Sequence, residues 1–493
     1  MSIPDLKSRM SSLDSFFLYH EKKESPLHVG AVSIFEGELS IEELIRTVDS
    51  RIHLLPRYQQ IIVSDPLNIG HPTWEADSNF DARKHISHVR LEEPGTEEQL
   101  SVLASELMSQ LLDRSKPLWD VVLVTGLAGN RSAMISRIHH CMVDGVSGVD
   151  LMKILFDLTP DPPPLPARWD PPPPPAPREP ARRIFDAVIG GLQEVMHRVV
   201  DIQNGLLTLT QSLVNQQSRA AAQSMSGEFP RLLSPVNMLP FNGPHSGQRH
   251  FIWMKLSFAE ARAIRGALQG SVNDVVLSIL AGAVSKYVQL HGQPVAGRHV
   301  RMMVPFNLRQ DHHQGTMGNV ISVLPVEIPL DKVDAVERFR YINHTTTIMK
   351  QGRMAEVVNL FLSMFGTIPA PLQSVFGALL NTPLPPFNMI ATNVPGPQIP
   401  LYSLGHRLLA HYPFVPIAYA IGFGVAIMSY DQHLFLGLTA DAQALPDVER
   451  MREYIYEAFT ELRQAAGVAP IEAHPLTAPP TRNRNQETTS ATA

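Results

Sequence analysis

Apolar residues in the first part of the chain follow two periodicities in turn. Runs of strand length and composition occupy residues 28–35, 119–127 and 132–138. Helical signals lie between these runs. Ser40 and Thr96 each stand three residues before a Glu or Gln, which is the spacing of a capping box at a helix start. This alternation of strands and capped helices predicts an α/β domain.

The second part of the chain repeats this order. A strand is expected at 251–256, a capping box at Ser257 and Glu260, and a further helix start at Asn273 and Asp274. The other predicted elements are strands at 300–306, 320–328, 388–393 and 434–439, and helices at 333–349 and 447–465. A strand followed by a capped helix near the start of each half indicates two similar α/β domains.

A proline-rich segment separates the two halves. Residues 160–180 contain twelve prolines, and this composition predicts an extended strap because proline fixes φ and has no N–H. In residues 181–226 apolar side chains recur at helical spacing. This spacing predicts either a linker helix that lies on the domains or a helix on a membrane surface. The predicted organisation is an N-terminal domain at 1–159, strap and linker at 160–245, a C-terminal domain at 246–470 and a disordered tail at 471–493.

Charge and cysteine content exclude several classes of function. The net charge is −6, so no basic surface indicates nucleic-acid binding. The single cysteine, Cys141, forms no intrachain disulfide and excludes cysteine-cluster metal sites, and no metal is predicted. The N-terminus lacks the apolar core of a signal peptide, so we expect a cytoplasmic protein that is not secreted.

One region is almost free of charge. Between residues 357 and 430 the only Asp, Glu, Lys or Arg is Arg407. Residues 408–430 are uncharged, but prolines and glycines interrupt them, so we expect buried strands and turns there and no membrane span. The region as a whole is either ordinary core or the lining of an apolar channel or lipid-facing surface.

The segment HHCMVDG, residues 139–145, carries the clearest chemical signal. It follows the strand predicted at 132–138 and contains two histidines, an aspartate and a glycine. Histidine accepts a proton near neutral pH, and strand alternation allows only one of His139 and His140 to face a given site. Cys141 is a poor candidate nucleophile, because adjacent side chains rarely point at each other. No GxSxG or P-loop motif is present.

HHCMVDG matches the HHxxxDG motif of the superfamily that contains chloramphenicol acetyltransferase, plant acyltransferases and the condensation domains of peptide synthetases. Over residues 10–465 the chain resembles the wax ester synthase/diacylglycerol acyltransferase branch of this superfamily. The further motifs that carry the resemblance are LDSFF at 13–17, PLW at 117–119, NDVVL at 273–277, GN at 318–319 and NVPGP at 393–397.

The resemblance implies a fold and a reaction. The fold would be two chloramphenicol-acetyltransferase-like α/β domains with mixed sheets around an interdomain channel. The reaction would be acyl transfer from acyl-CoA, as co-substrate, to diacylglycerol or a long-chain fatty alcohol. His140 would be the general base without an acyl-enzyme, and no cofactor would be permanently bound. Peripheral association with a membrane or lipid inclusion is expected, whereas coenzyme A contacts and oligomeric state stay open.

Supporting roles also follow from the resemblance. His139 and Gly145 would shape the loop. Asp144 would pair with an arginine, for which Arg309 is the first candidate and Arg301 the second. Asp144 would thereby hold the loop and not orient the base.

Four other residues are candidates for substrate contact or structural support. Asn273 would either cap a helix with Asp274 or place its amide near the developing oxyanion or the accepting hydroxyl. Pro117 and Trp119 are expected to pack structurally.

Two other functions fit part of the pattern. One is a free-standing condensation-type acyltransferase that uses carrier-bound thioesters. The other is a non-catalytic lipid-droplet-binding protein. The intact HHxxxDG motif favours an enzyme, because a binding protein has no need of a base at this position.

Overall fold

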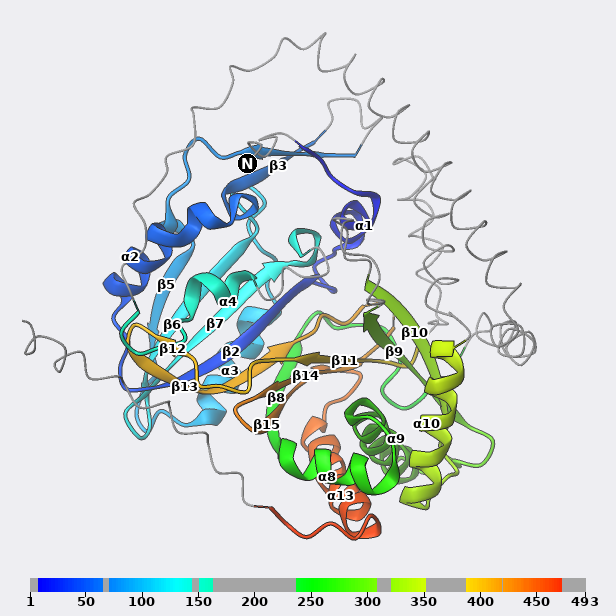
Figure 1. Cartoon of the computed structure of the whole chain (residues 1–493). Helices are drawn as coiled ribbons and strands as arrows, with labels where there is room; N and C mark the ends of the chain where they lie inside the picture. The colour runs from blue at the N-terminus through cyan, green and yellow to red at the C-terminus, as the bar shows by residue number, and fades with distance from the viewer. Residues whose placement is uncertain are drawn as a thin grey trace, which may run out of the picture.

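In the described residues of the computed structural model, two six-stranded sheets and one three-stranded sheet form the framework (Figure 1). In both large sheets parallel and antiparallel pairs occur together, so the predicted α/β class with mixed sheets is confirmed. The structure describes residues 8–64, 71–143, 150–162, 236–307, 321–351, 387–418 and 420–471.

The first large sheet has the strand order β12-β13-β2-β7-β6-β5. Only β5 and β6 pair in parallel within it. Its strands are β2 (His28–Glu36), β5 (Ile86–Arg90), β6 (Trp119–Leu127), β7 (Arg131–His139), β12 (Tyr402–Ser403) and β13 (His406–Phe414).

The second large sheet has the order β10-β9-β11-β14-β15-β8, and β11 runs parallel to both of its neighbours. Its strands are β8 (Arg249–Ser257), β9 (His299–Asn307), β10 (Ile321–Pro329), β11 (Met389–Pro395), β14 (Phe423–Tyr430) and β15 (His433–Asp441). The small sheet consists of β1 (Ser8–Arg9), β4 (Thr73–Ala76) and β3 (Gln60–Val63).

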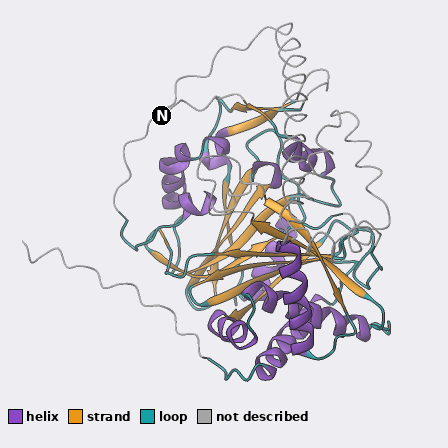
Figure 2. Cartoon of the chain, turned by 45° about the vertical axis from the view of Figure 1, so that its right-hand side comes forward, coloured by secondary structure: helices purple, strands orange, loops and turns teal. Residues whose placement is uncertain are grey.

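Helices flank both large sheets, and the strands gather in the middle of the molecule (Figure 2). The α-helices are α1 (Ser12–His20), α2 (Ile41–Arg51), α3 (Glu97–Met108), α4 (Asp150–Leu155), α8 (Phe258–Leu268), α9 (Val272–Leu290), α10 (Ala335–Gln351) and α13 (Val448–Ala465). The 3-10 turns are η1 (Ile52–Leu54), η2 (Pro56–Gln59), η3 (Ala82–Lys84) and η4 (His140–Met142).

The helix starts follow the capping signals of the sequence. Thr96 and Gln99 form the complete capping box of α3, and the hydroxyl groups of Ser40 and Ser257 accept the expected backbone N–H groups. The helix predicted to start at Asn273 and Asp274 is confirmed, since both residues lie in the first turn of α9, but neither of them is the N-cap. The N-cap of α9 is Ser271, and Asp274 completes the box from the third helical position, because its carboxylate reaches back to the Ser271 N–H.

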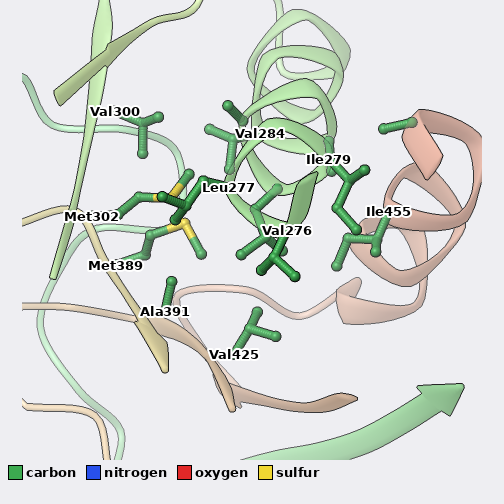
Figure 3. Close-up of a cluster of buried hydrophobic side chains, with 14 of the residues drawn as sticks. Val276, Leu277, Ile279, Val284, Val300, Met302, Met389, Ala391, Val425 and Ile455 are labelled. Atoms are coloured by element: carbon green, nitrogen blue, oxygen red, sulfur yellow. The ribbon is translucent and has the colours of Figure 1, made fainter. Parts of the chain in front are cut away.

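The core of the second half forms around α9. Fourteen of the nineteen residues of this helix are buried, and it packs between the sheet and α13 (Figure 3). Val276 and Leu277 of α9 lie near Met302 of β9 and Met389 of β11, while Ile455 of α13 approaches from the other side (Figure 3). Burial of apolar area at about 25 cal/mol per Å² makes this cluster a main source of stability.

The first large sheet contains two strands from the second half of the chain. β13 pairs antiparallel with β2, so residues about 380 positions apart in sequence become neighbours, as in the Ser33–His411 hydrogen bond of 2.9 Å. In the 408–430 region β14 is a buried strand, as predicted, whereas β13 is mostly buried but exposes Leu409. The domain boundaries and the interdomain channel stay predictions.

Helix α3 connects the two halves through a stripe of serines. β8 is the edge strand of the second sheet, and its backbone groups bond to this stripe instead of to another strand. The Ser101 hydroxyl donates to the Phe251 carbonyl, and the Ser105 hydroxyl accepts the Phe251 N–H. The Ser109 hydroxyl accepts the Arg249 N–H. The helix therefore covers a sheet edge that would otherwise expose unpaired backbone groups.

Among the described helices, none is by itself long and apolar enough to cross a membrane; α8 and α9, bent by 99° at their junction, reach that length and composition only as a pair. The strap beyond residue 162, the linker predicted at 181–226 and the tail from residue 472 lie outside the described residues.

Candidate active site

The two histidines of the motif lie where β7 ends and the 3-10 turn η4 begins. His139 is the last residue of β7, and its Nδ1 accepts the backbone N–H of Cys141 at 3.1 Å. The His140 N–H donates to the Leu27 carbonyl at 2.8 Å, which fastens the turn to the segment entering β2. Helix α1 packs against η4. The orientation of the histidines is thus fixed by backbone hydrogen bonds.

His139 faces a buried carboxylate. Its side chain is fully buried, and Nε2 lies 3.3 Å from Oε1 of Glu21. Because Nδ1 accepts the Cys141 N–H, Nε2 is the ring nitrogen that carries a proton, and it faces Glu21. Burial opposes ionisation of Glu21, but His139, the Leu27 N–H and Arg114 together hold its pKa at about 2. His139 therefore contacts the turn through Nδ1 and faces Glu21 through Nε2.

His140 has a different environment. Part of its surface is open, and its ring stacks on Phe17 of α1 with centroids 3.8 Å apart and planes 15° apart. Nδ1 is buried and has no hydrogen-bond partner among the described residues. The dense protein around the ring disfavours the imidazolium, and with the nearby His139 it lowers the pKa to about 4. His140 is therefore a neutral imidazole at physiological pH.

The thiol of Cys141 is unsuited to nucleophilic chemistry. The side chain is buried, and desolvation raises its pKa well above the usual value. A thiolate is the reactive form of cysteine, and this environment suppresses it. The burial agrees with the sequence argument against a cysteine nucleophile.

A third histidine lies behind the pair. His28, the first residue of β2, is the cross-strand partner of His139 and is fully buried. Within the part of the chain that the structure describes, neither of its ring nitrogens has a hydrogen-bond partner. Burial lowers its pKa to about 3, and the positive charges of Arg137 and Arg249 contribute in the same direction. The ring is thus a neutral packing element against Phe414, with centroids 5.6 Å apart.

Several predicted site residues lie outside the described part of the chain, namely Asp144, Gly145 and Arg309. The ion pair proposed for Asp144 therefore stays a prediction. The second arginine candidate, Arg301, is buried on β9 and donates from Nη2 to Glu327 Oε2 at 2.7 Å.

Asp274 joins α9 to α10. Its carboxylate accepts hydrogen bonds from Ser271, from Asn343 at 3.0 Å and from Thr346 at 2.8 Å. Desolvation of the buried carboxylate is outweighed by these donors, so its pKa is lowered. Asn273 precedes it with a half-buried side chain. Neither residue hydrogen-bonds His140 in the described part of the chain.

Pro117 and Trp119 belong to the packing of the first sheet. Both are buried, the Trp119 indole donates to the Tyr58 carbonyl at 2.8 Å, and its ring stacks on His85. No group of three or more His, Cys, Asp or Glu side chains within the described ranges is placed to hold a metal ion.

Sequence reasoning missed the groups that hold the histidine turn. Glu21 and Leu27 lie more than a hundred residues before His139, and no local pattern connects them with it. Phe17 belongs to the LDSFF motif, but nothing in that motif announces a ring stacked on His140.

Comparison with known proteins identifies the family. Residues 10–276 match the wax ester synthase/diacylglycerol acyltransferase catalytic domain, and residues 317–463 match the C-terminal domain of the same family. The chain belongs to this family. It is accordingly an acyltransferase, as the HHxxxDG motif predicts.

Curated relatives cover nearly the whole chain. A probable diacylglycerol O-acyltransferase of Mycobacterium tuberculosis, tgs1, is 26% identical over 467 residues, which are 92% of this chain and 96% of the relative. A second one from the same species, tgs2, is 29% identical over 469 residues, 92% of this chain and 98% of the relative.

Solved structures show the same fold. The wax ester synthase/diacylglycerol acyltransferase of Marinobacter aquaeolei superposes with a TM-score of 0.64 at 23% identity, covering 94% of this chain and all of the other. A starter condensation domain of rhizomide synthetase gives a TM-score of 0.55 at 10% identity, covering 95% and 96% of the two chains. The predicted condensation-domain-like fold of two domains with mixed sheets is confirmed.

Proposed function

We propose that this acyltransferase moves an acyl group from acyl-CoA to the hydroxyl of diacylglycerol or a long-chain fatty alcohol, with His140 as the general base. The observation that carries the proposal is the contrast between the two motif histidines. His139 is fully buried beside Glu21, whereas His140 is partly open and neutral. The mycobacterial relatives, named as probable diacylglycerol acyltransferases, support the acceptor class.

The proposed reaction is a direct transfer. Because Nδ1 of His140 is buried, Nε2 takes the proton of the acceptor hydroxyl while the oxygen attacks the thioester carbonyl carbon. The tetrahedral intermediate then collapses, the carbon–sulfur bond breaks, and the imidazolium returns its proton to the departing thiolate. An ester and free coenzyme A result, and no acyl-enzyme forms. General-base assistance of this kind contributes about 10²–10⁴ in rate.

The low pKa of His140 suits the second step of this transfer, in which the imidazolium protonates the departing thiolate. A ring with a pKa of about 4 is entirely neutral at pH 7 and is ready to accept a proton. It is a modest base, but its protonated form is a strong acid toward a thiolate, since an ordinary thiol has a pKa of about 8.5. Expulsion of coenzyme A is therefore strongly favoured once the proton has been taken.

The apolar substrates suggest where the protein acts. Each buried CH₂ group contributes about 0.8 kcal/mol, so a long acyl chain requires an apolar binding region. We infer that part of the charge-poor segment 357–430 lines this apolar binding site for the acyl chain. We also infer that the protein works on a membrane or lipid-inclusion surface. The exposed apolar side chains in the described part of this segment, Val394, Ile399 and Leu409, support contact with lipid.

A product assay with parallel donors and acceptors tests the proposal. Palmitoyl-CoA is offered with hexadecanol and with dioleoylglycerol, and a carrier-protein-bound palmitoyl thioester is offered as the competing donor. We expect wax ester or triacylglycerol from the CoA donor and stoichiometric release of free coenzyme A. Turnover with the carrier-bound donor alone, or binding of both lipids without any ester product, would contradict the proposal.

A further inference from the structure

The sharp turn at residues 22–25 connects the two halves of the molecule. Lys22 and Ser25 form an isolated antiparallel bridge, so the turn is closed on itself. It follows α1 directly and leads into β2. Its neighbours in sequence are Glu21 and Leu27, the two residues that hold the histidine turn. The 22–25 turn is therefore joined directly through the backbone to both residues that contact the histidine turn.

A buried ion pair of the second half holds this turn. Arg249 of β8 and Asp441 of β15 have side chains only 1% and 0% exposed, and Nη1 lies 2.9 Å from Oδ2. The second guanidinium nitrogen, Nη2, donates to the Glu24 carbonyl at 2.9 Å and also reaches the Ile417 carbonyl at 3.4 Å. The guanidinium thus bonds three segments at once: β15, the 22–25 turn and the chain after β13.

Neighbouring residues fix the same contact. The Ser246 N–H and hydroxyl both donate to Asp441, at 2.9 and 3.0 Å, which orients its carboxylate. Ser25 Oγ and His245 Nδ1 lie at hydrogen-bond distance, 3.1 Å. Gly247, with φ +86°, approaches so closely that an added Cβ would lie 3.1 Å from the Glu24 Cα. We call Arg249, Asp441, Ser246, His245 and Gly247 the clamp.

Both ends of the clamped segment lead to the motif. Before the turn, Oε1 of Glu21 lies 3.3 Å from His139 Nε2 and also accepts the Leu27 N–H at 2.9 Å. After the turn, the Leu27 carbonyl accepts the His140 N–H. Arg114 forms an ion pair with the second carboxylate oxygen of Glu21, Oε2, at 3.0 Å. The path from Arg249 to His140 thus runs through one seven-residue segment, 21–27.

We propose that the Arg249–Asp441 pair is a positioning element for catalysis: it holds the 22–25 turn so that Glu21 and Leu27 present the catalytic histidine correctly. The second half of the molecule thereby contributes to the reaction without touching the reacting atoms. This inference rests on the proposed function of His140. A misplacement of about 1 Å at a reacting group costs up to about 10²-fold in rate, so a loosened support is measurable.

The test compares clamp variants with an ion pair that has no contact with the 21–27 segment. Arg249→Lys keeps a positive charge beside Asp441 but cannot also bond Glu24 and Ile417. Asp441→Asn removes the charge but keeps the volume. The matched control is Glu260→Gln, which breaks the buried Arg463–Glu260 pair between α13 and α8. Circular dichroism and thermal unfolding establish that each variant is folded.

For the folded clamp variants we expect kcat to fall about tenfold or more with little change in the KM for palmitoyl-CoA. Amide hydrogen exchange at residues 139–143 should accelerate, because the His140 and Cys141 N–H groups lose fixed partners. The acid limb of kcat/KM should also move to higher pH, since a loosened turn hydrates His140 and favours its protonation. Glu260→Gln should lower the unfolding temperature without these three changes.

Milder variants keep the test decisive if the charged variants do not fold. Ser25→Ala removes the contact between Ser25 and His245 of the clamp. Gly247→Ala adds a Cβ that forces the 22–25 turn away. Both variants should show the same changes in kcat, amide exchange and acid limb, to a smaller degree. The inference is overturned if the clamp variants behave like Glu260→Gln in their kcat, in the acid limb of kcat/KM and in the amide exchange of residues 139–143. Failure of the proposed function is distinguishable, because the unmodified protein itself would then form no ester.

Discussion

At the scale of single residues, His139 and His140 are adjacent in the sequence but have opposite surroundings. His139 is sealed beside Glu21, and its Nδ1 is occupied by the Cys141 N–H. His140 stacks on Phe17 and as a residue is only half-buried. The motif predicts that only one of the two serves the site. The structure adds the groups that distinguish them.

The thiol of Cys141 is expected to be dispensable for catalysis. Cys141→Ala should keep kcat within about threefold of the unmodified enzyme, because the buried thiol, with its raised pKa, has no part in the proposed transfer. Steady-state kinetics with palmitoyl-CoA and dioleoylglycerol measure this. A loss of activity comparable to that of a His140 variant, in a folded protein, would indicate a covalent acyl-cysteine instead.

The pH dependence of kcat/KM should reflect the pKa of His140. Its folded-state pKa of about 4 lies below the ordinary value of 6.5, so the base stays deprotonated through pH 5 and is lost only as pH falls through about 4. A pH–rate profile with the free enzyme, over the range in which it stays folded, provides the measurement. An acid limb centred near pH 6.5 would mean that the ring is hydrated as in open solution.

At the scale of elements, local signals predicted most helices and strands. Thr96 with Gln99 specifies the start of α3, and the apolar run at 119–127 coincides with β6, because both signals depend on neighbouring residues only. The pairing of β13 with β2 has no such signal, since it joins residues nearly four hundred positions apart. Helix α1 and the short strand β5 were not predicted, because their apolar patterns are weak.

The serine stripe of α3 permits a prediction at this scale. Ser105→Ala should destabilise the protein by about 1–3 kcal/mol, because it leaves the buried Phe251 N–H without its acceptor. Denaturant unfolding gives the change in free energy. The control is Ser50→Ala on α2, whose exposed hydroxyl bonds only its own helix through the Thr47 carbonyl. Equal effects of the two substitutions would show that the stripe does not hold β8.

At the scale of the whole molecule, contacts between the two halves give the site its form. β13 completes the first sheet, α3 covers the edge of the second, and the Arg249–Asp441 pair reaches the 22–25 turn. The sequence resemblance predicted two such halves. It could not predict these contacts, because each one depends on residues whose proximity exists only in the folded chain.

Buried neutral histidines should make the folded state sensitive to acid. The pKa of His28 is lowered to about 3 and that of His411 to about 4 by burial, whereas both groups bind protons near 6.5 in the unfolded chain. Stability should therefore fall as pH drops from about 6.5 toward 4. The double variant His411→Leu/Ser33→Ala, which removes both partners of a buried hydrogen bond, should show a shallower fall in denaturant unfolding. An unchanged pH slope would contradict the assignment for His411.

The most direct measurement of the central claim is ester formation by His140→Ala, with Cys141→Ala as the matched neighbouring variant. Both proteins are assayed with palmitoyl-CoA and either dioleoylglycerol or hexadecanol after their folding has been verified. The proposed mechanism requires kcat to fall by about 10² or more in His140→Ala and to persist in Cys141→Ala. Undiminished ester formation by folded His140→Ala would contradict the role of this imidazole as the base.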